Sequence, residues 1–347
     1  RHARYDLGAG GTQNMTSGAG STQHMTQEAG SAQVLKRDFT IRILAVVLVA
    51  LLLAGPLLPR WAMFLITVSL CYGMVVLGMM LLMRTGVVSF GHGLYYCLGA
   101  YAAGTLDVLF GVSDIAVMLL AAVAVTGVGS ALLGLLLRKY RDIFFAMLSL
   151  AFSMILYGLL VKTSALGSSD GFNVAAKTLF GIRIAGTEFE RYLIFAVTVL
   201  VAFVAAVCMH KYLASHMGRL AGAIRDNELR VEYMGASVRN TIHVNYVISA
   251  VLAGLGGAMA AVSVGHIDPE MSYWTTSGEF VFVAILAGTG SVLAPFLGAF
   301  IFETIRSFAY EYSPNTWQMA LGTTMLLVIM FLPGGLWSLF TRMRKAA

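Results

Sequence analysis

Nine long stretches without an Asp, Glu, Lys or Arg dominate this chain of 347 residues. They are Leu44–Pro59, Trp61–Met83, Thr85–Leu106, Ile115–Leu137, Ile143–Val161, Tyr192–Met209, Val244–Gly265, Phe280–Phe302 and Tyr312–Thr341. Most approach the roughly 20 residues that an α-helix needs to cross about 30 Å of hydrocarbon. The sequence therefore predicts an all-α polytopic membrane protein.

The composition agrees with this prediction. Charged residues make up 12% of the chain and its mean hydropathy is +0.80, whereas about a quarter of the residues of a soluble domain are charged. So few polar side chains could not cover a water-exposed surface, and lipid is the expected solvent. The net charge of +6 then marks cytosolic loops and does not indicate nucleic-acid binding.

The first 38 residues differ from the rest of the chain. They hold an imperfect repeat rich in Gly, Thr and Gln, seen in Gly8–Thr16 and Gly18–Thr26. Such residues bury too little apolar area to offset the cost of ordering, so a disordered tail is expected over 1–38. The membrane domain is expected over 39–341, followed by a short cytosolic tail over 342–347.

Basic residues predict the orientation, because they gather on the cytosolic side of membrane proteins. The densest basic loop is 210–243, and alternation of the spans from this loop predicts that both termini are cytosolic. The basic residues that this places inside are Lys36, Arg37, Arg42, Arg84, Arg138, Lys139, Arg141, Lys211, Arg219, Arg225, Arg230, Arg239, Arg342, Arg344 and Lys345.

Two apolar stretches are interrupted by glycine. In the later one, Phe280–Phe302, the part before the glycines (Phe280–Ala287) is too short to cross alone. It is therefore expected to descend, turn at Gly288–Ser291 and return over Leu293–Tyr310. A last span is expected over Trp317–Pro333. The first is Thr85–Leu106, where Leu98–Tyr101 has a near match in the second stretch; an internal repeat and chance both explain that match. Broken backbone at membrane depth must face protein or a water-filled path, and it is a pointer to a transport pathway. About 8–10 transmembrane or re-entrant helices are expected, with two broken segments.

Five motifs carry a resemblance to a known family. They are Gly86–Tyr101 (GVVSFGHGLYYCLGAY), Gly167–Gly171 (GSSDG), Gly218–Glu228 (GRLAGAIRDNE) continuing to Gly235, Leu286–Ala299 (LAGTGSVLAPFLGA) and Phe331–Leu336 (FLPGGL). Together they resemble the LivM-type permeases of branched-chain amino-acid ABC importers, over about residues 40–340. Ala287 and Ala294 stand where many members carry glycine.

The resemblance implies an ABC importer permease fold in a bacterial inner membrane. It also implies partners: a second, LivH-like permease, two cytosolic ATPases and an extracytoplasmic solute-binding protein. Independently of the resemblance, the chain has no Gly-x-x-x-x-Gly-Lys-Ser/Thr loop, so it is not expected to hydrolyse ATP itself. No catalytic residue, metal site or bound cofactor is predicted, and ATP is expected to be used by the partner ATPases.

The loop 210–243 is expected to contain an amphipathic coupling helix that seats on an ATPase; a solvated loop that only anchors the topology is the alternative. The residues to which the resemblance assigns coupling are Gly218, Arg219, Ile224, Arg225, Asp226, Asn227, Glu228 and Gly235.

The broken segments supply candidates for the translocation path. They are Ser89, Phe90, Gly91, His92, Tyr95, Tyr96, Gly288, Thr289, Gly290 and Ser291. Packing is the alternative role for each, and for His92 it is the capping of carbonyls released by the break. The glycines after Ala287 could instead offer backbone N–H groups at a helix terminus to a solute carboxylate.

Three acidic residues are expected in external loops, where they could dock the binding protein through charge or simply be solvated. They are Asp170, Asp268 and Glu279. Glu303 and Arg306 are three residues apart and are expected to form a structural pair. The cysteines Cys71, Cys97 and Cys208 are expected to be packing residues.

These observations predict a transmembrane permease subunit that imports branched-chain or other hydrophobic amino acids. Urea, amides, and aromatic or dicarboxylic acids are alternative solutes. An ion-coupled secondary transporter is the alternative from another class. It is disfavoured because such carriers bury an ionisable residue, while Asp107 and Glu303 here are expected near the ends of spans.

Overall fold

The computed structural model describes residues 39–174, 178–179, 182–183, 187–312, 316–331 and 335–338. The expected disordered tail 1–38 and cytosolic tail 342–347 lie outside these residues. The chain divides into two units, 1–47 and 48–347. The described part of the first unit is helical, and the second unit holds the helices from α2 onward.

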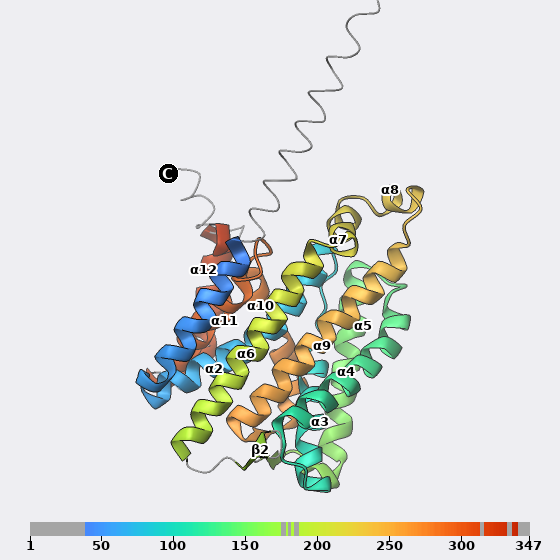
Figure 1. The fold of residues 1–347 in the computed structure, drawn as a ribbon. Helices are drawn as coiled ribbons and strands as arrows, with labels where there is room; N and C mark the ends of the chain where they lie inside the picture. The colour runs from blue at the N-terminus through green and yellow to red at the C-terminus, as the bar shows by residue number, and fades with distance from the viewer. Residues whose placement is uncertain are drawn as a thin grey trace, which may run out of the picture. The chain divides into compact units, whose positions relative to one another are not determined.

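The described secondary structure is almost entirely helical (Figure 1). The helices are Phe39–Leu57, α2 Arg60–Arg84, α3 His92–Phe110, α4 Ile115–Leu137, α5 Asp142–Lys162, α6 Thr187–Leu213, α7 His216–Asp226, α8 Glu228–Tyr233, α9 Val238–Val264, α10 Trp274–Ala287, α11 Ala294–Tyr312 and α12 Trp317–Phe331. Short 3₁₀ turns are η1 Gly55–Leu57, η2 Ser164–Leu166 and η3 Pro269–Ser272, and the strands are β1 Phe172–Asn173, β2 Thr178–Leu179, β3 Ile182–Arg183 and β4 His266–Ile267.

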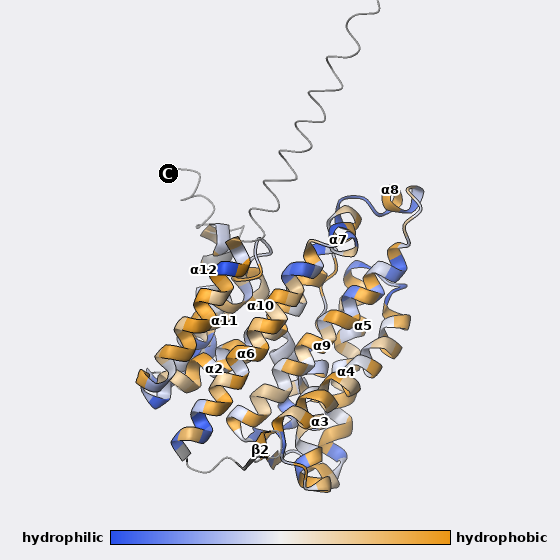
Figure 2. Ribbon diagram, viewed as in Figure 1, coloured by the Kyte–Doolittle hydropathy of each residue, from blue (hydrophilic) through white to orange (hydrophobic). Residues whose placement is uncertain are grey.

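Six of the described helices are long and apolar enough to cross a membrane: the first helix, α2, α4, α5, α6 and α9. The helices from α2 onward, including the shorter or less apolar α3, α10, α11 and α12, form a polytopic bundle, so the predicted fold class is confirmed. Figure 2 shows apolar residues along the length of these helices and hydrophilic residues concentrated near α7, α8 and the helix ends.

Helices α2 and α9 form the interior of the bundle. In their most apolar windows, 78% and 67% of the residues are buried, against 28% in α4 and 22% in α5. The exposed leucines of α4, such as Leu120 and Leu132, would be unfavourable in water but suit lipid.

Glycines allow α3 and α9 to pack with their backbones in contact. A Cβ atom added to Gly99 would overlap the carbonyl of Gly254, and one added to Gly257 would overlap the carbonyl of Tyr96. Small residues at helix crossings are typical of membrane bundles, where close packing replaces the hydrophobic effect as the source of association. The expected glycine-rich character of this region therefore has a packing explanation.

The first predicted break lies between α2 and α3. Residues 85–91 are not helical, and the backbone N–H of Phe90 donates to Ser149 Oγ on α5, at 3.1 Å. His92 Nε2 lies 2.6 Å from the Oγ of Ser249, near the middle of α9. Helix α3 therefore begins inside the bundle.

A second helix, α10, also begins inside the bundle. Before it, the chain leaves α9 and passes through β4 and η3. The carbonyl of Ser272 in η3 accepts a hydrogen bond from Ser153 Oγ, in the middle of α5, at 2.8 Å. The backbone N–H of Gly93 donates to Ser277 Oγ at 3.1 Å, so the first turns of α3 and α10 meet.

The glycine turn 288–291 joins α10 to α11, which confirms the predicted pair of helices around it. Its expected position at membrane depth is wrong. The Nε of Arg84, the last residue of α2, donates to the carbonyl of Thr289 at 3.0 Å, so the turn lies level with the end of α2. The difference arises because α10 begins at Trp274 instead of Phe280, which extends it to that end.

The two ends of the bundle differ. Helices α7 and α8 lie at one end and β2 lies at the other (Figure 1). Near β2, strand β1 pairs antiparallel with β4, with Phe172 opposite Ile267, and β2 pairs antiparallel with β3. Arg60 of α2 forms an ion pair with Glu188 of α6, so the first turns of these two helices lie side by side.

Candidate functional site

Most of the candidate path residues of the first break are fully buried in protein. Ser89 Oγ accepts a hydrogen bond from the N–H of Gly91 at 3.2 Å, which satisfies one donor that the missing helical turn leaves free. His92 is buried, and its Nε2 lies within hydrogen-bond distance of Ser249 Oγ. Phe90 differs from its neighbours, because it lines a cavity.

The two candidate tyrosines lie among aromatic rings. The hydroxyl of Tyr95 donates to the hydroxyl of Tyr246 on α9, at 2.9 Å. Tyr96 packs edge-on against Tyr72 and against Phe280, with ring centroids 5.8 and 5.2 Å apart. Both side chains are buried, so they fix the position of α3 in this conformation.

The second candidate segment is held by groups from two distant parts of the chain. Gly288 has a φ of +82°, which favours glycine. Arg84 binds the carbonyl of Thr289, and the N–H of Leu336 donates to the carbonyl of Leu286 at 2.8 Å. Ser291 Oγ accepts from the N–H of Leu293 at 3.3 Å. This geometry agrees with a packing turn, whose N–H groups are partly used by the chain itself.

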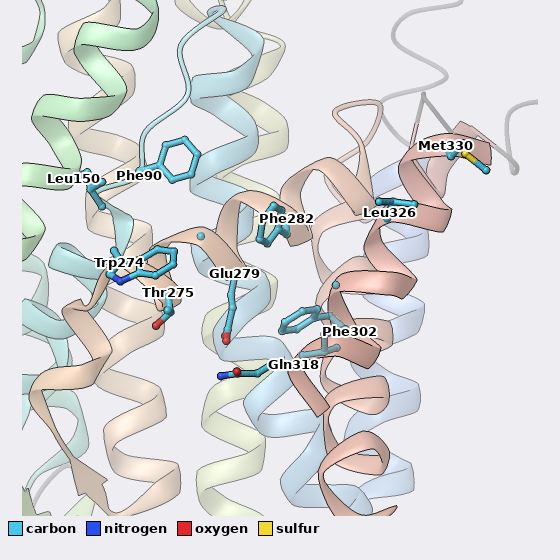
Figure 3. A pocket seen from close by; sticks show the side chains of 13 residues that line it. Phe90, Leu150, Trp274, Thr275, Glu279, Phe282, Phe302, Gln318, Leu326 and Met330 are labelled. Atoms are coloured by element: carbon cyan, nitrogen blue, oxygen red, sulfur yellow. The ribbon is translucent and has the colours of Figure 1, made fainter. Parts of the chain in front are cut away.

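A cavity of about 1120 Å³ opens where the first break, α5, α10, α11 and α12 come together (Figure 3). Its walls are Phe90, Leu150, Trp274, Thr275, Gly278, Glu279, Phe282, Phe302, Gln318, Leu321, Gly322, Leu326 and Met330. Of these, the sequence analysis singled out Phe90 as a path residue. The others come from four helices, and no local motif signals that they share a wall.

A charged cluster lies at this cavity. Arg306 Nη1 lies 3.3 Å from Glu279 Oε2, 3.3 Å from Glu303 Oε1 and 3.0 Å from the Tyr72 hydroxyl. The guanidinium also stands over the Tyr72 ring, 5.6 Å from its centroid, an arrangement that favours a cation. The predicted pairing of Glu303 with Arg306 is thus present in the structure.

Two expectations about acidic residues are wrong. Glu279 lies within helix α10 and not in an external loop, and it pairs there with Arg306 of the adjacent α11. Glu303 lies near the middle of α11 and is buried, not near a span end. The sequence does contain both partners of the cluster, but Glu279 and Arg306 are 27 residues apart and their pairing depends on the turn between the helices.

The other two candidate docking acids lie outside the helices. Asp268 caps η3, with Oδ1 accepting from the N–H of Met271 at 3.3 Å. Asp170 is exposed and its Oδ1 accepts from Ser169 Oγ. Both belong to the end of the bundle that holds β1 and β4, so their docking role stays a prediction.

The predicted coupling region folds as two short helices. Ser215 caps α7 with its hydroxyl, and α7 buries Gly218, Ala221 and Ile224 on one face. Arg219 and Arg225 lie on its exposed face. This periodicity confirms an amphipathic helix in the loop 210–243.

Three of the coupling candidates have structural roles at the ends of these helices. A Cβ atom on Gly218 would overlap the carbonyl of Tyr212, so the corner between α6 and α7 requires glycine. Asn227 caps α8 by accepting from the N–H of Arg230 at 3.0 Å, and Gly235 has a φ of +84° just after α8. Asp226 is exposed.

Two contacts tie this region to the membrane helices. A Cβ atom placed on Gly86, in the first break, would lie 3.4 Å from the side chain of Arg225. Glu228 forms an ion pair with Arg141, the residue before α5, at 2.7 Å. The α7–α8 pair therefore rests on the segment that leads into α3.

Cysteine packing is confirmed for two of the three residues. Cys71 and Cys97 are buried, whereas Cys208 on α6 is exposed. The described part of the chain contains no group of three or more His, Cys, Asp or Glu residues arranged to hold a metal ion.

A polytopic bundle with two helices that begin inside it, and a cavity between such a helix and its neighbours, is the arrangement expected of a membrane transport protein. The family model for the permease component of branched-chain amino acid transport systems matches residues 61–330. The chain belongs to this family.

Individual relatives are proteins of the same family. The chain is 25% identical to the LivM permease protein of the high-affinity branched-chain amino acid transport system of Escherichia coli strain K12, over 85% of this chain and 74% of that protein. It is 25% identical to the corresponding BraD protein of Pseudomonas aeruginosa, over 78% of this chain and 92% of that protein. The LivH permease protein of Salmonella typhimurium is 24% identical over 49% of this chain and 51% of its own length. No solved structure matches the chain.

Proposed function

We propose that this chain is the transmembrane permease subunit of an ATP-binding-cassette importer for branched-chain or other hydrophobic amino acids. It would pair with a second, LivH-like permease, receive its solute from an extracytoplasmic binding protein and be driven by two cytosolic ATPases. The observation that carries the proposal is the amphipathic α7, seated at the end of the bundle against the segment that begins α3.

The contacts suggest how ATPase movement would reach the solute path. A displacement of α7 would press Arg225 on the backbone at Gly86. Residues 85–91 lead directly into α3, whose first turn bonds Ser277 of α10. Because α10 lines the cavity, one continuous set of packed elements joins the coupling helix to the cavity wall.

The exposed surface of α7 and α8 has the composition of a docking site for a protein. Leu229, Tyr233 and Met234 are 65%, 88% and 66% exposed, and Arg225 and Asp226 flank them on α7. Exposed apolar side chains rimmed by charges are typical of protein interfaces. We assign this surface to an ATPase subunit.

Family membership favours this function over an ion-coupled carrier. An ion-coupled carrier would share the helices that begin inside the bundle and the buried Glu279–Arg306–Glu303 cluster. The names of the relatives favour branched-chain amino acids over urea, amides, and aromatic or dicarboxylic acids.

The test is reconstitution of this chain in proteoliposomes with its partner permease, ATPases and binding protein. Leucine-loaded binding protein should raise ATP hydrolysis several-fold, and labelled leucine should accumulate. Uptake by this chain alone, driven by a sodium or proton gradient, would instead support the ion-coupled carrier.

A second test uses substitutions on the exposed surface of α7 and α8. Arg225→Ala combined with Tyr233→Ala should reduce the amount of ATPase that purifies with the permease pair. Arg239→Ala changes an exposed basic residue of α9 outside α7 and α8 and serves as the matched control. Normal ATPase assembly in the double variant would show that α7 and α8 do not form the docking site.

A further inference from the structure

The cavity wall carries one ionisable group. Among its lining residues, Glu279 is the only one with a charged side chain; Thr275 and Gln318 are polar and most of the others are apolar. Figure 3 shows the Glu279 side chain reaching toward Gln318, with Thr275 on the same side of α10. Thr275 and Glu279 are four residues apart, which places them together on one face of the helix.

The charges around Glu279 do not balance. Two carboxylates, those of Glu279 and Glu303, share the single guanidinium of Arg306. A surplus acid in a low-dielectric interior is unfavourable unless a further cation or a proton joins it. The Glu303 side chain is 8% exposed and the Glu279 side chain 23% exposed. Glu303 and Arg306 line a separate cavity of about 440 Å³, so Glu279 is the acid that a cation in the larger cavity meets.

The rest of the wall fits an aliphatic solute. Phe282, Leu326 and Met330 offer apolar surface in the same cavity as Glu279. An amino acid with a branched aliphatic side chain presents one ammonium group and one apolar group, and it matches both parts of the wall. Urea and simple amides bring no cation to the surplus acid, and a dicarboxylic acid would add to the negative charge.

We propose that Glu279 binds the ammonium group of the amino acid as it passes through the permease, and that Arg306 holds the carboxylate of Glu279 in position. This inference rests on the proposed function, and it names the solute class as zwitterionic amino acids with an apolar side chain. Glu279 is then a solute-binding residue of the permease, separate from any site on the binding protein.

The cluster supplies a matched pair of variants. Glu279→Gln and Glu303→Gln each remove one acid from Arg306 and keep the side-chain shape, but only Glu279 lines the cavity. Both are measured in the complete importer in proteoliposomes, with labelled L-leucine and with the ATPase rate recorded in parallel.

We expect Glu279→Gln to lower leucine uptake by about tenfold or more, the effect of losing one charge-assisted hydrogen bond. Glu303→Gln removes the surplus charge but keeps the acid that lines the cavity, so it should lower uptake less than Glu279→Gln does. The ATPase response to loaded binding protein should persist in both variants, and Glu279→Asp should restore part of the uptake.

A reporter outside the charged cluster gives a second readout. Thr275→Cys, in a chain with Cys208→Ala, places a thiol in the cavity one turn from Glu279. L-Leucine should slow its modification by a methanethiosulfonate reagent. 4-Methylpentanoate, which has the same aliphatic group but no ammonium, should not slow it.

Each contrary outcome has a distinct meaning. Equal loss of uptake in Glu279→Gln and Glu303→Gln would reduce Glu279 to a structural partner of Arg306. Normal uptake in Glu279→Gln, or equal protection of the Thr275→Cys thiol by both compounds, would contradict ammonium binding at Glu279 but leave the proposed function standing. Failure of the wild-type importer to accumulate leucine would overturn the proposed function, and this inference with it.

Discussion

At the scale of single residues, glycine determines how closely the interior helices approach. Gly99 of α3 faces the carbonyl of Gly254 on α9, and Gly257 faces the carbonyl of Tyr96. Backbone lies against backbone at both positions, so neither contact can adjust by rotating a side chain. These positions should therefore be among the least tolerant of substitution in the bundle.

Gly99→Ala should destabilise the protein by about 1–3 kcal/mol, because its Cβ atom forces α3 and α9 apart. Thermal unfolding of the protein in detergent would measure this as a lower midpoint. Gly158→Ala on α5 is the control, since nothing lies within 4 Å of its added Cβ atom and alanine favours a helix. Equal midpoints for the two variants would contradict the close packing described here.

At the scale of elements, the turn between α10 and α11 depends on Arg84. The side chain crosses from the end of α2 to the carbonyl of Thr289 through both Nε and Nη2. Carbonyls left free at a helix end need such a partner when they are shielded from water. Arg84 thus fixes the ends of two elements that are more than 200 residues apart in the chain.

Arg84→Met should loosen this turn without changing the helices themselves. A cysteine at position 291, introduced as Ser291→Cys in a chain with Cys208→Ala, would then react with a maleimide several-fold faster than it does beside Arg84. Arg84→Lys keeps one donor and should give an intermediate rate. An unchanged rate in Arg84→Met would mean that Gly335 and Leu336 hold the turn alone.

At the scale of the whole molecule, charge and contacts place the coupling helices at one end. Arg84, Arg141 and α7–α8 lie together there, and the β1–β4 pair lies at the other end (Figure 1). If the basic end is cytosolic, as such residues usually are, these two ends are separated by the membrane.

This orientation predicts the labelling of two single cysteines in a chain with Cys208→Ala. Tyr233→Cys, on α8, should react only when the reagent reaches the cytosolic side of right-side-out vesicles. Ser169→Cys, beside the exposed Asp170, should react from outside. Reaction of both from the same side would overturn the topology. The basic tail 342–347 lies outside the described residues, and its cytosolic location stays a prediction.

Sequence patterns predicted the elements better than the site. The length of the stretches without charged residues identified the membrane helices. The turn at Gly288 was predicted because Phe280–Ala287 is too short to cross the membrane. The η3 entry into α10 was missed, because the carbonyl of Ser272 is satisfied by Ser153, which is distant in sequence. The cavity was missed for the same reason. Glu279 of α10 and Gln318 of α12 share a wall only because the chain folds back through α11 between them.

The junction of α3 with α10 differs in kind from the crossing of α3 with α9. Besides the edge-on contact of Tyr96 with Phe280, it has a hydrogen bond from the N–H of Gly93 to Ser277 Oγ. Such a bond is worth about 1 kcal/mol, and a water molecule can replace either partner. The glycine crossing has no such substitute. The packing of α2, α3 and α9 is therefore rigid, whereas the junction of α3 with α10 separates more easily. A movement that takes α10 away from α3 would leave the packing of α2, α3 and α9 intact.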